Sequence, residues 1–147
     1  MREPRNIDDE TAAYILHTRR PFEDLRQAAA QLAGILVLNA SGANTASPDH
    51  PLVRTAAELH CSALEEVQHT RPTPRVNRHH RSLLEAASAL AEALAAVRQD
   101  PDIDPVLVPL RRAYAHLQNA ANTLPGFEMV SFEQGCCALH TQTRTQS

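Results

Sequence analysis

The sequence predicts an all-α protein: an antiparallel up-down-up-down four-helix bundle with a short extra N-terminal helix and an apolar C-terminal tail packed on it. Two observations favour this fold. Apolar residues recur at alternating steps of four and three along several long segments, which is the spacing of one face of an α-helix. The connections between these segments are short or of modest length, as between antiparallel neighbours in a bundle. We find no internal repeat and no βαβ pattern.

The N-terminal segment predicts a short first helix over about residues 8–18, after a loose arm of residues 1–6. The acids from Asp8 to Glu10 suit the positive N-terminal end of a helix. Tyr14 and Ile15 would face the core. Pro21 either begins the second helix or kinks the first, and the sequence leaves both alternatives open.

The second and third helices are predicted over about residues 21–40 and 49–70. A loop rich in small and polar residues separates them. The inward face of the second helix is formed by Leu25, Ala29, Leu32 and Leu36. The third helix begins at Pro48 or Pro51, and its inward face is formed by Leu52, Ala56, Leu59, Ala63 and Val67.

Residues 74–99 carry the clearest helical signal. The hydroxyl of Thr73 can accept a hydrogen bond from an unpaired N–H group, and Pro74 is tolerated at the first helical position. Asp100 precedes Pro101 and marks the end, because proline disfavours helical geometry in the residue before it. Seven residues share the inward side: Val76, His80, Leu83, Ala87, Leu90, Leu94 and Val97.

The last long helix is predicted from Asp104 to Leu124 and ends at Pro125-Gly126. Pro109 would bend its first part, or delay the regular part until Pro109 itself. The expected inward stripe is Ile103, Leu107, Leu110, Tyr114, Leu117, Ala121 and Leu124.

The C-terminal tail has a composition of its own. Phe127, Met129, Val130 and Phe132 place large apolar side chains after the bundle is complete, and such residues would form an exposed apolar patch in water. We therefore predict a bundle domain of residues 1–126 and a tail of residues 127–147. The tail should be packed over about residues 127–140 and disordered beyond them. The sequence leaves open whether the tail packs on its own bundle, on a second copy or on a partner.

The composition indicates what the core consists of and which partners and locations are favoured. Of the 147 residues, 43% are hydrophobic and only 3% aromatic, so the core must consist of Ala, Leu and Val. The net charge of −3 makes nucleic acid an unfavoured partner. No stretch is long and apolar enough to span a membrane. We expect a cytoplasmic protein, and we attribute the absence of Lys to a GC-rich, bacterial genome.

The sequence lacks the motifs of common enzyme chemistry. It contains no nucleophile elbow, no phosphate-binding Gly-rich loop and no dinucleotide fingerprint. Only four Gly residues are present, too few for most cofactor loops. A non-enzymatic role is therefore favoured.

The predicted topology sorts the charges. It places Asp49, Asp100, Asp102 and Asp104 at one end of the bundle and a group of arginines at the other. The predicted ligands for an anionic small molecule or an acidic protein partner are Arg71, Arg75, Arg78 and Arg81, because guanidinium groups offer rigid, bidentate donors. The competing interpretation is a solvated charged turn with local Glu partners.

A metal site at the same end is a second hypothesis. Glu66 and His69 have a spacing that places both on one side of a helix, and His80 lies at the same height. The tail adds Cys136, Cys137 and His140, whose thiolates and imidazole are ligands typical of zinc. Adjacent cysteines are awkward ligands for one tetrahedral ion, so a transition metal such as Zn is an alternative rather than the main expectation.

Two functional hypotheses follow. The first is a non-catalytic helical protein that acts through self-association, as a homodimer, or through partner binding at its Arg/His-rich end. Ala86, Ala89, Ala93 and Ala96 widen the apolar face of the 74–99 helix beyond what one bundle requires, which favours a dimer. The second is a small metal- or anion-binding bundle with its site at the same end.

Overall fold

The computed structural model describes residues 7–42, 49–99 and 104–129. These ranges contain no β-strand, so the prediction of an all-α protein is confirmed. None of the helices described there has both the length and the apolar character needed to cross a bilayer. The elements are α1 (Asp9–Ala40), α2 (Pro51–His69), the short 3-10 helix η1 (Pro74–Val76), α3 (Asn77–Gln99) and α4 (Asp104–Thr123).

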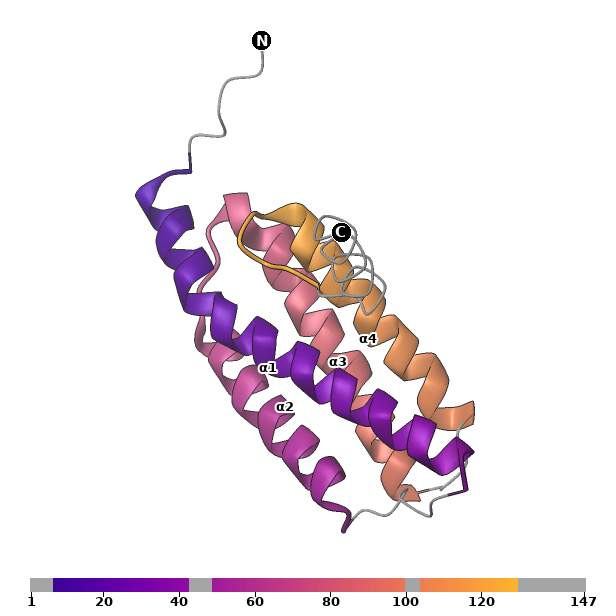
Figure 1. The fold of residues 1–147 in the computed structure, drawn as a ribbon. Coiled ribbons are helices and arrows are strands. Elements are labelled where there is room, and N and C mark those ends of the chain that lie inside the picture. The colour runs from indigo at the N-terminus through magenta and orange to yellow at the C-terminus, as the bar shows by residue number, and fades with distance from the viewer. Residues whose placement is uncertain (1–6, 43–48, 100–103, 130–147) are drawn as a thin grey trace, which may run out of the picture.

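Successive helices alternate in direction along the long axis of the molecule (Figure 1). Helix α1 packs mainly on α2, and α3 packs mainly on α4 and also contacts α1 and α2. The start of α1, the start of α3 and the end of α4 therefore lie at one end, the upper end in Figure 1. The starts of α2 and α4, with Asp49 and Asp104, lie at the other end.

Helix α1 is a single helix of 32 residues, so the residues expected to form a separate short helix are its first part. Pro21 lies inside it and is buried. A proline removes one backbone hydrogen bond and crowds the preceding turn, but the helix packs on the core on both sides of that position, and such packing supplies most helical stability in proteins. Asp8 caps the start, where its carboxylate accepts a 2.7 Å hydrogen bond from the N–H group of Thr11.

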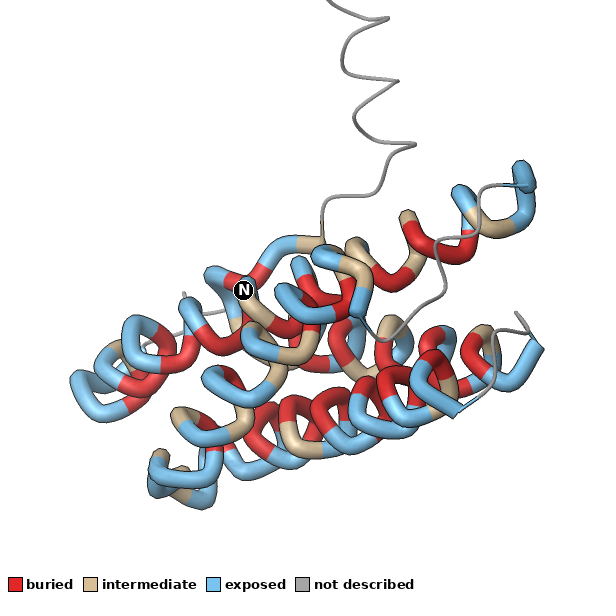
Figure 2. Tube along the Cα trace, turned by 90° about the horizontal axis from the view of Figure 1, so that it is seen from below, coloured by how far each residue is buried: buried red, intermediate tan, exposed pale blue. Residues whose placement is uncertain are grey.

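Helix α3 is buried on two sides. All seven residues of its predicted inward stripe are buried. Three of the four alanines on which the dimer prediction depended, Ala86, Ala89 and Ala93, are no more than 5% exposed within this single chain, because α3 packs on α4 as well as on α1 and α2. The fourth, Ala96, is half-buried. Figure 2 shows the same division, with buried positions on the inward sides of the helices and exposed positions on the outer sides.

The starts of α3 and α4 differ in detail from the prediction. Thr73 precedes η1, but its side chain makes no capping hydrogen bond, and its carbonyl instead accepts a 3.1 Å bond from the N–H group of Val76. Helix α4 begins at Asp104 and includes Pro109, which is buried, so the regular helix is not delayed. Its buried side is also rotated from the predicted stripe and is formed by Val106, Pro109, Leu110, Ala113, Leu117 and Ala120.

The chain turns back onto the core after α4. Gly126 has a φ of +95°, and a Cβ atom there would lie 3.1 Å from the Cγ2 atom of Ile15, so this turn favours glycine on two grounds. Phe127 follows it and is only 5% exposed, and Met129 packs against the core. The rest of the predicted tail lies outside the described residues.

Candidate functional site

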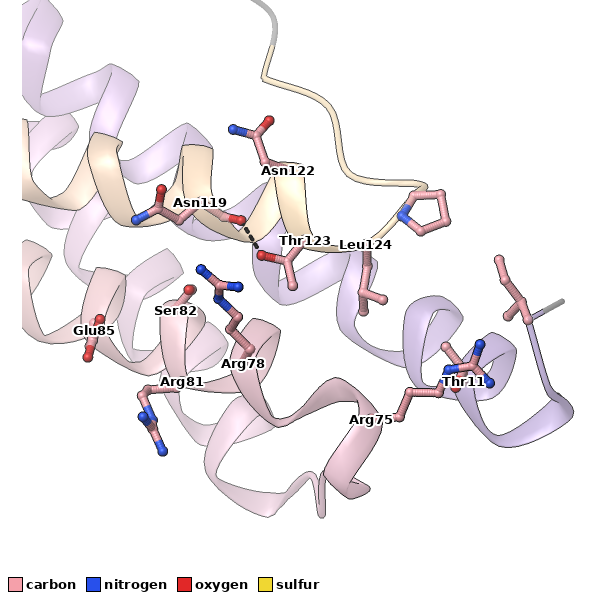
Figure 3. Close-up of a pocket in the computed structure, with 12 residues that line it drawn as sticks. Thr11, Arg75, Arg78, Arg81, Ser82, Glu85, Asn119, Asn122, Thr123 and Leu124 are labelled. Atoms are coloured by element: carbon pink, nitrogen blue, oxygen red, sulfur yellow. Dashed lines mark hydrogen bonds between the residues drawn. The ribbon is translucent and has the colours of Figure 1, made fainter. Parts of the chain in front are cut away.

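An open groove with a volume of about 780 Å³ lies at the end of the molecule where α1 and α3 begin and α4 ends. We call it the arginine groove. Helix α3 and η1 form one wall, and α4 with the residues after it forms the other (Figure 3). Ile7 and Thr11, at the start of α1, complete the lining. The groove is therefore built from three segments that are far apart in the sequence.

Three of the four arginines predicted to bind an anion line this groove: Arg75, Arg78 and Arg81. They recur every third residue, so neighbouring turns of the helix carry them. In Figure 3, Arg78 extends from α3 toward Asn119 and Thr123 of α4, whereas Arg81 points away from α4. The groove thus has a central cation and a second cation at its edge.

The ion pairs of the three arginines differ. A guanidinium nitrogen of Arg75 lies 3.2 Å from an Oδ2 atom of Asp8, and both side chains are about half exposed. Hydrogen bonding from Thr11 and the positive charge of the Arg75 guanidinium lower the pKa of the Asp8 carboxyl. Arg78 and Arg81 form no ion pair with the described part of the chain. Two guanidinium groups at the groove are therefore available to an external anion.

The rest of the lining is mostly polar and uncharged. Ser82 of α3 lies opposite Asn119 and Thr123 of α4, whereas Asn122, which also lines the groove, points away from α3 (Figure 3). The Asn122 side-chain oxygen accepts a 3.1 Å bond from the side chain of Gln118, which leaves its NH₂ group as a donor. Among the described residues, the lining contains one carboxylate, that of Glu85, whose Oε2 atom lies 3.2 Å from the Nδ1 atom of His116.

A buried aromatic cluster holds the elements around the groove together. The Tyr14 hydroxyl of α1 and the Nδ1 atom of His79 of α3 lie 2.8 Å apart and share a hydrogen bond. The ring of Phe127 packs on His79, with ring centroids 4.2 Å apart, and also contacts Phe22 at 5.2 Å. His79 thereby joins α1, α3 and the chain after α4.

Burial determines the protonation of this cluster. His79 is fully buried, and its desolvation, together with the neighbouring His80, lowers its pKa to about 4. Burial also lowers the pKa of His80 and raises that of Tyr14. All three groups are therefore neutral at pH 7. The Nε2 atom of His79 and the Nδ1 atom of His80 are buried without a hydrogen-bond partner in the described structure.

The structure separates the remaining predicted site residues. Arg71 is exposed in the connection between α2 and η1 and does not line the arginine groove. His80 is buried, whereas His69 is exposed and its Nδ1 atom lies 2.7 Å from the backbone oxygen of Glu65. Glu66 is half-buried.

The predicted metal site is only partly described. Cys136, Cys137 and His140 lie outside the described residues. In residues 7–42, 49–99 and 104–129, no group of three His, Cys, Asp or Glu side chains could hold a metal ion. The metal site stays a prediction that the described residues do not support.

Sequence reasoning missed the uncharged half of the groove. Thr11, Ser82, Asn119, Asn122 and Thr123 belong to no motif, and each is an ordinary polar residue of a helix. The only signal that could have found them is their position, because each lies within about three turns of a helix end that the predicted topology brings to the arginines. Comparison with protein-family models, with curated proteins and with solved structures found no match for this chain.

Proposed function

We propose that this protein is a non-catalytic helical-bundle protein, with antiparallel helices, that binds an anionic partner or ligand in the arginine groove. The observation that carries the proposal is the position of Arg78 and Arg81, which line the groove without an ion pair to the described residues. Guanidinium groups in such a place offer paired N–H donors to a carboxylate or a phosphate. We infer that the protein acts in the cytoplasm.

The competing interpretation, a charged turn neutralised by its own carboxylates, has less support. Glu85 is the carboxylate of the lining, and it lies beside His116 rather than within ion-pair distance of Arg81. Surface ion pairs add little stability in any case, so stability alone gives no reason to gather three arginines around one groove.

The other predicted functions are favoured less by the described residues. Three of the four alanines of α3 that motivated a homodimer are buried by packing within one chain. The proposed zinc ligands of the tail lie outside the described ranges, and the others do not form a cluster. Self-association and metal binding therefore remain alternatives without a supporting contact.

A titration with citrate, a small tricarboxylate, tests the proposal. We expect saturable changes in the NMR signals of the Arg78 side chain, and we expect the double variant Arg78→Gln/Arg81→Gln to lose binding by about tenfold or more. Arg98→Gln is the matched control, because Arg98 is an exposed arginine of α3 outside the groove. Absence of binding, or equal binding by the double variant, would contradict the proposal.

A further inference from the structure

We propose that the occupant of the arginine groove is an acidic segment of a protein partner, bound in an extended conformation over about four to five residues. This inference rests on the proposed function and names the partner of the same site. It is argued from the length of the groove, from its charges and from its asparagine side chains.

The groove is longer than a small anion requires. The wall formed by η1 and α3 runs from Arg75 to Glu85, and ten helical residues span about 15 Å. An extended chain advances about 3.3 Å per residue, so this distance accommodates about four to five residues of peptide. A single phosphate or carboxylate group would contact one arginine and leave the rest of the lining unused.

One arginine of the groove already pairs with a carboxylate of the chain itself. Asp8 pairs with Arg75 at one end, and the preceding residue, Ile7, lines the groove together with Leu124 and Pro125. An apolar side chain followed by a carboxylate thus lies beside that end. Arg78 and Arg81 continue the series of cations beyond it, and they match the carboxylates of an incoming acidic segment.

The asparagines distinguish a peptide from a simple anion. Asn119 and Asn122 both line the α4 wall. The side-chain amide of Asn119 has a donor and an acceptor that complement the N–H and C=O groups of a peptide bond, and Asn122, whose oxygen accepts from Gln118, offers its NH₂ group. A phosphate group needs only donors. None of the described residues that line the groove is aromatic, so the groove has no platform on which a nucleotide base could stack.

Fluorescence anisotropy with short labelled peptides tests this inference. Two probes are five-residue peptides with four glutamates and one leucine, and the leucine stands first in one peptide and last in the other. The third probe is a matched peptide in which glutamine replaces every glutamate. We expect at least one acidic peptide to bind with a dissociation constant about tenfold lower than that of citrate, which is measured by competition. The glutamine peptide should not bind, and higher ionic strength should weaken the complex.

Variants locate the peptide. Arg78→Gln/Arg81→Gln should weaken peptide binding by about tenfold or more, whereas Arg98→Gln should leave it unchanged. Asn119→Ala should weaken the peptide complex by about threefold to tenfold and leave citrate binding unaltered. Circular dichroism of each variant verifies that it is folded.

The outcomes separate the two proposals. If citrate or pyrophosphate binds as tightly as the acidic peptides, or if Asn119→Ala has no effect on peptide binding, the peptide inference is wrong and the anion-binding function stands. If neither peptide nor small anion binds, both proposals fail. Peptide binding that survives the double arginine variant would place the partner elsewhere and also overturn the inference.

Discussion

The Tyr14 hydroxyl and the Nδ1 atom of His79 meet at 2.8 Å although 65 positions separate them in the chain. This hydrogen bond fixes the start of α1 to the start of α3, and both of these segments line the arginine groove. The same histidine packs on Phe127. One buried imidazole therefore sets the relative position of the segments that form the groove.

Replacing Tyr14 with phenylalanine should destabilise the protein by about 1–3 kcal/mol, because it leaves the buried Nδ1 atom of His79 without a partner. Urea unfolding measures the change. Tyr114→Phe is the matched control, since Tyr114 is half-buried and its hydroxyl has no hydrogen bond in the described structure. Its unfolding free energy should change by less than about 0.5 kcal/mol. Equal effects of the two variants would show that the Tyr14–His79 bond contributes nothing specific.

Stability should fall on acidification. Burial, and then His80, lower the pKa of His79 from 6.5 to about 4, so between these values the unfolded chain binds a proton that the folded chain does not. The stabilisation is complete above about pH 6.5 and decreases as the pH falls toward 4, by up to about 3 kcal/mol. Urea unfolding at several pH values between 4 and 8 measures the slope.

The variant His79→Gln should flatten that slope, because glutamine does not titrate. Part of the slope should remain, since burial lowers the pKa of His80 in the same direction. The control is His17→Gln, which removes an exposed histidine from α1. A slope that is as steep in His79→Gln as in the parent protein would contradict the assignment to His79.

Phe127 should matter for stability although it follows the last helix. Its ring is buried against His79 and Phe22, and removal of a buried phenylalanine ring costs about 3 kcal/mol. We expect Phe127→Ala to lose about that much and to raise the pKa of His79 toward 6.5, as water gains access to the imidazole. NMR titration of the histidine signals measures the pKa. In Phe127→Leu, which keeps apolar volume, both effects should be smaller.

The close packing of α3 on its neighbours predicts a contrast between two alanines of that helix. Ala93 is fully buried and Ala91 is exposed. Ala93→Leu should destabilise by about 1–3 kcal/mol through overpacking, and Ala91→Leu should change stability by less than about 0.5 kcal/mol. Thermal and urea unfolding measure both. A strong loss for Ala91→Leu would indicate that the outer side of α3 is covered by another molecule.

Helix positions were the most predictable part of this fold. In residues 74–99 the alternating spacing has few interruptions, and every residue of the predicted stripe is buried. Pro21 was not predictable, because the same residue can open a helix or sit inside one, and the outcome depends on packing against distant segments. The rotated face of α4 has a similar cause, since apolar residues flank the predicted stripe and the contacts with α3 decide which are buried most.

The charged residues of the candidate site were predictable from the sequence, whereas the buried cluster beneath them was not. The topology brought Arg75, Arg78 and Arg81 to one end, where they line the groove. His79 lies one position away from the predicted stripe, and its partner Tyr14 comes from another helix. The periodicity within one helix does not predict a hydrogen bond between two helices, so this cluster could be identified only from the structure.

Because the groove is built from three distant segments of the chain, ligand binding is coupled to folding by mass action. Thr11, Arg78 and Asn119 lie together only in the native chain, so an unfolded molecule has no equivalent site. A ligand at one hundred times its dissociation constant would add about 2.7 kcal/mol to the unfolding free energy. The cellular lifetime of the chain would then rise and fall with the concentration of the molecule that it binds.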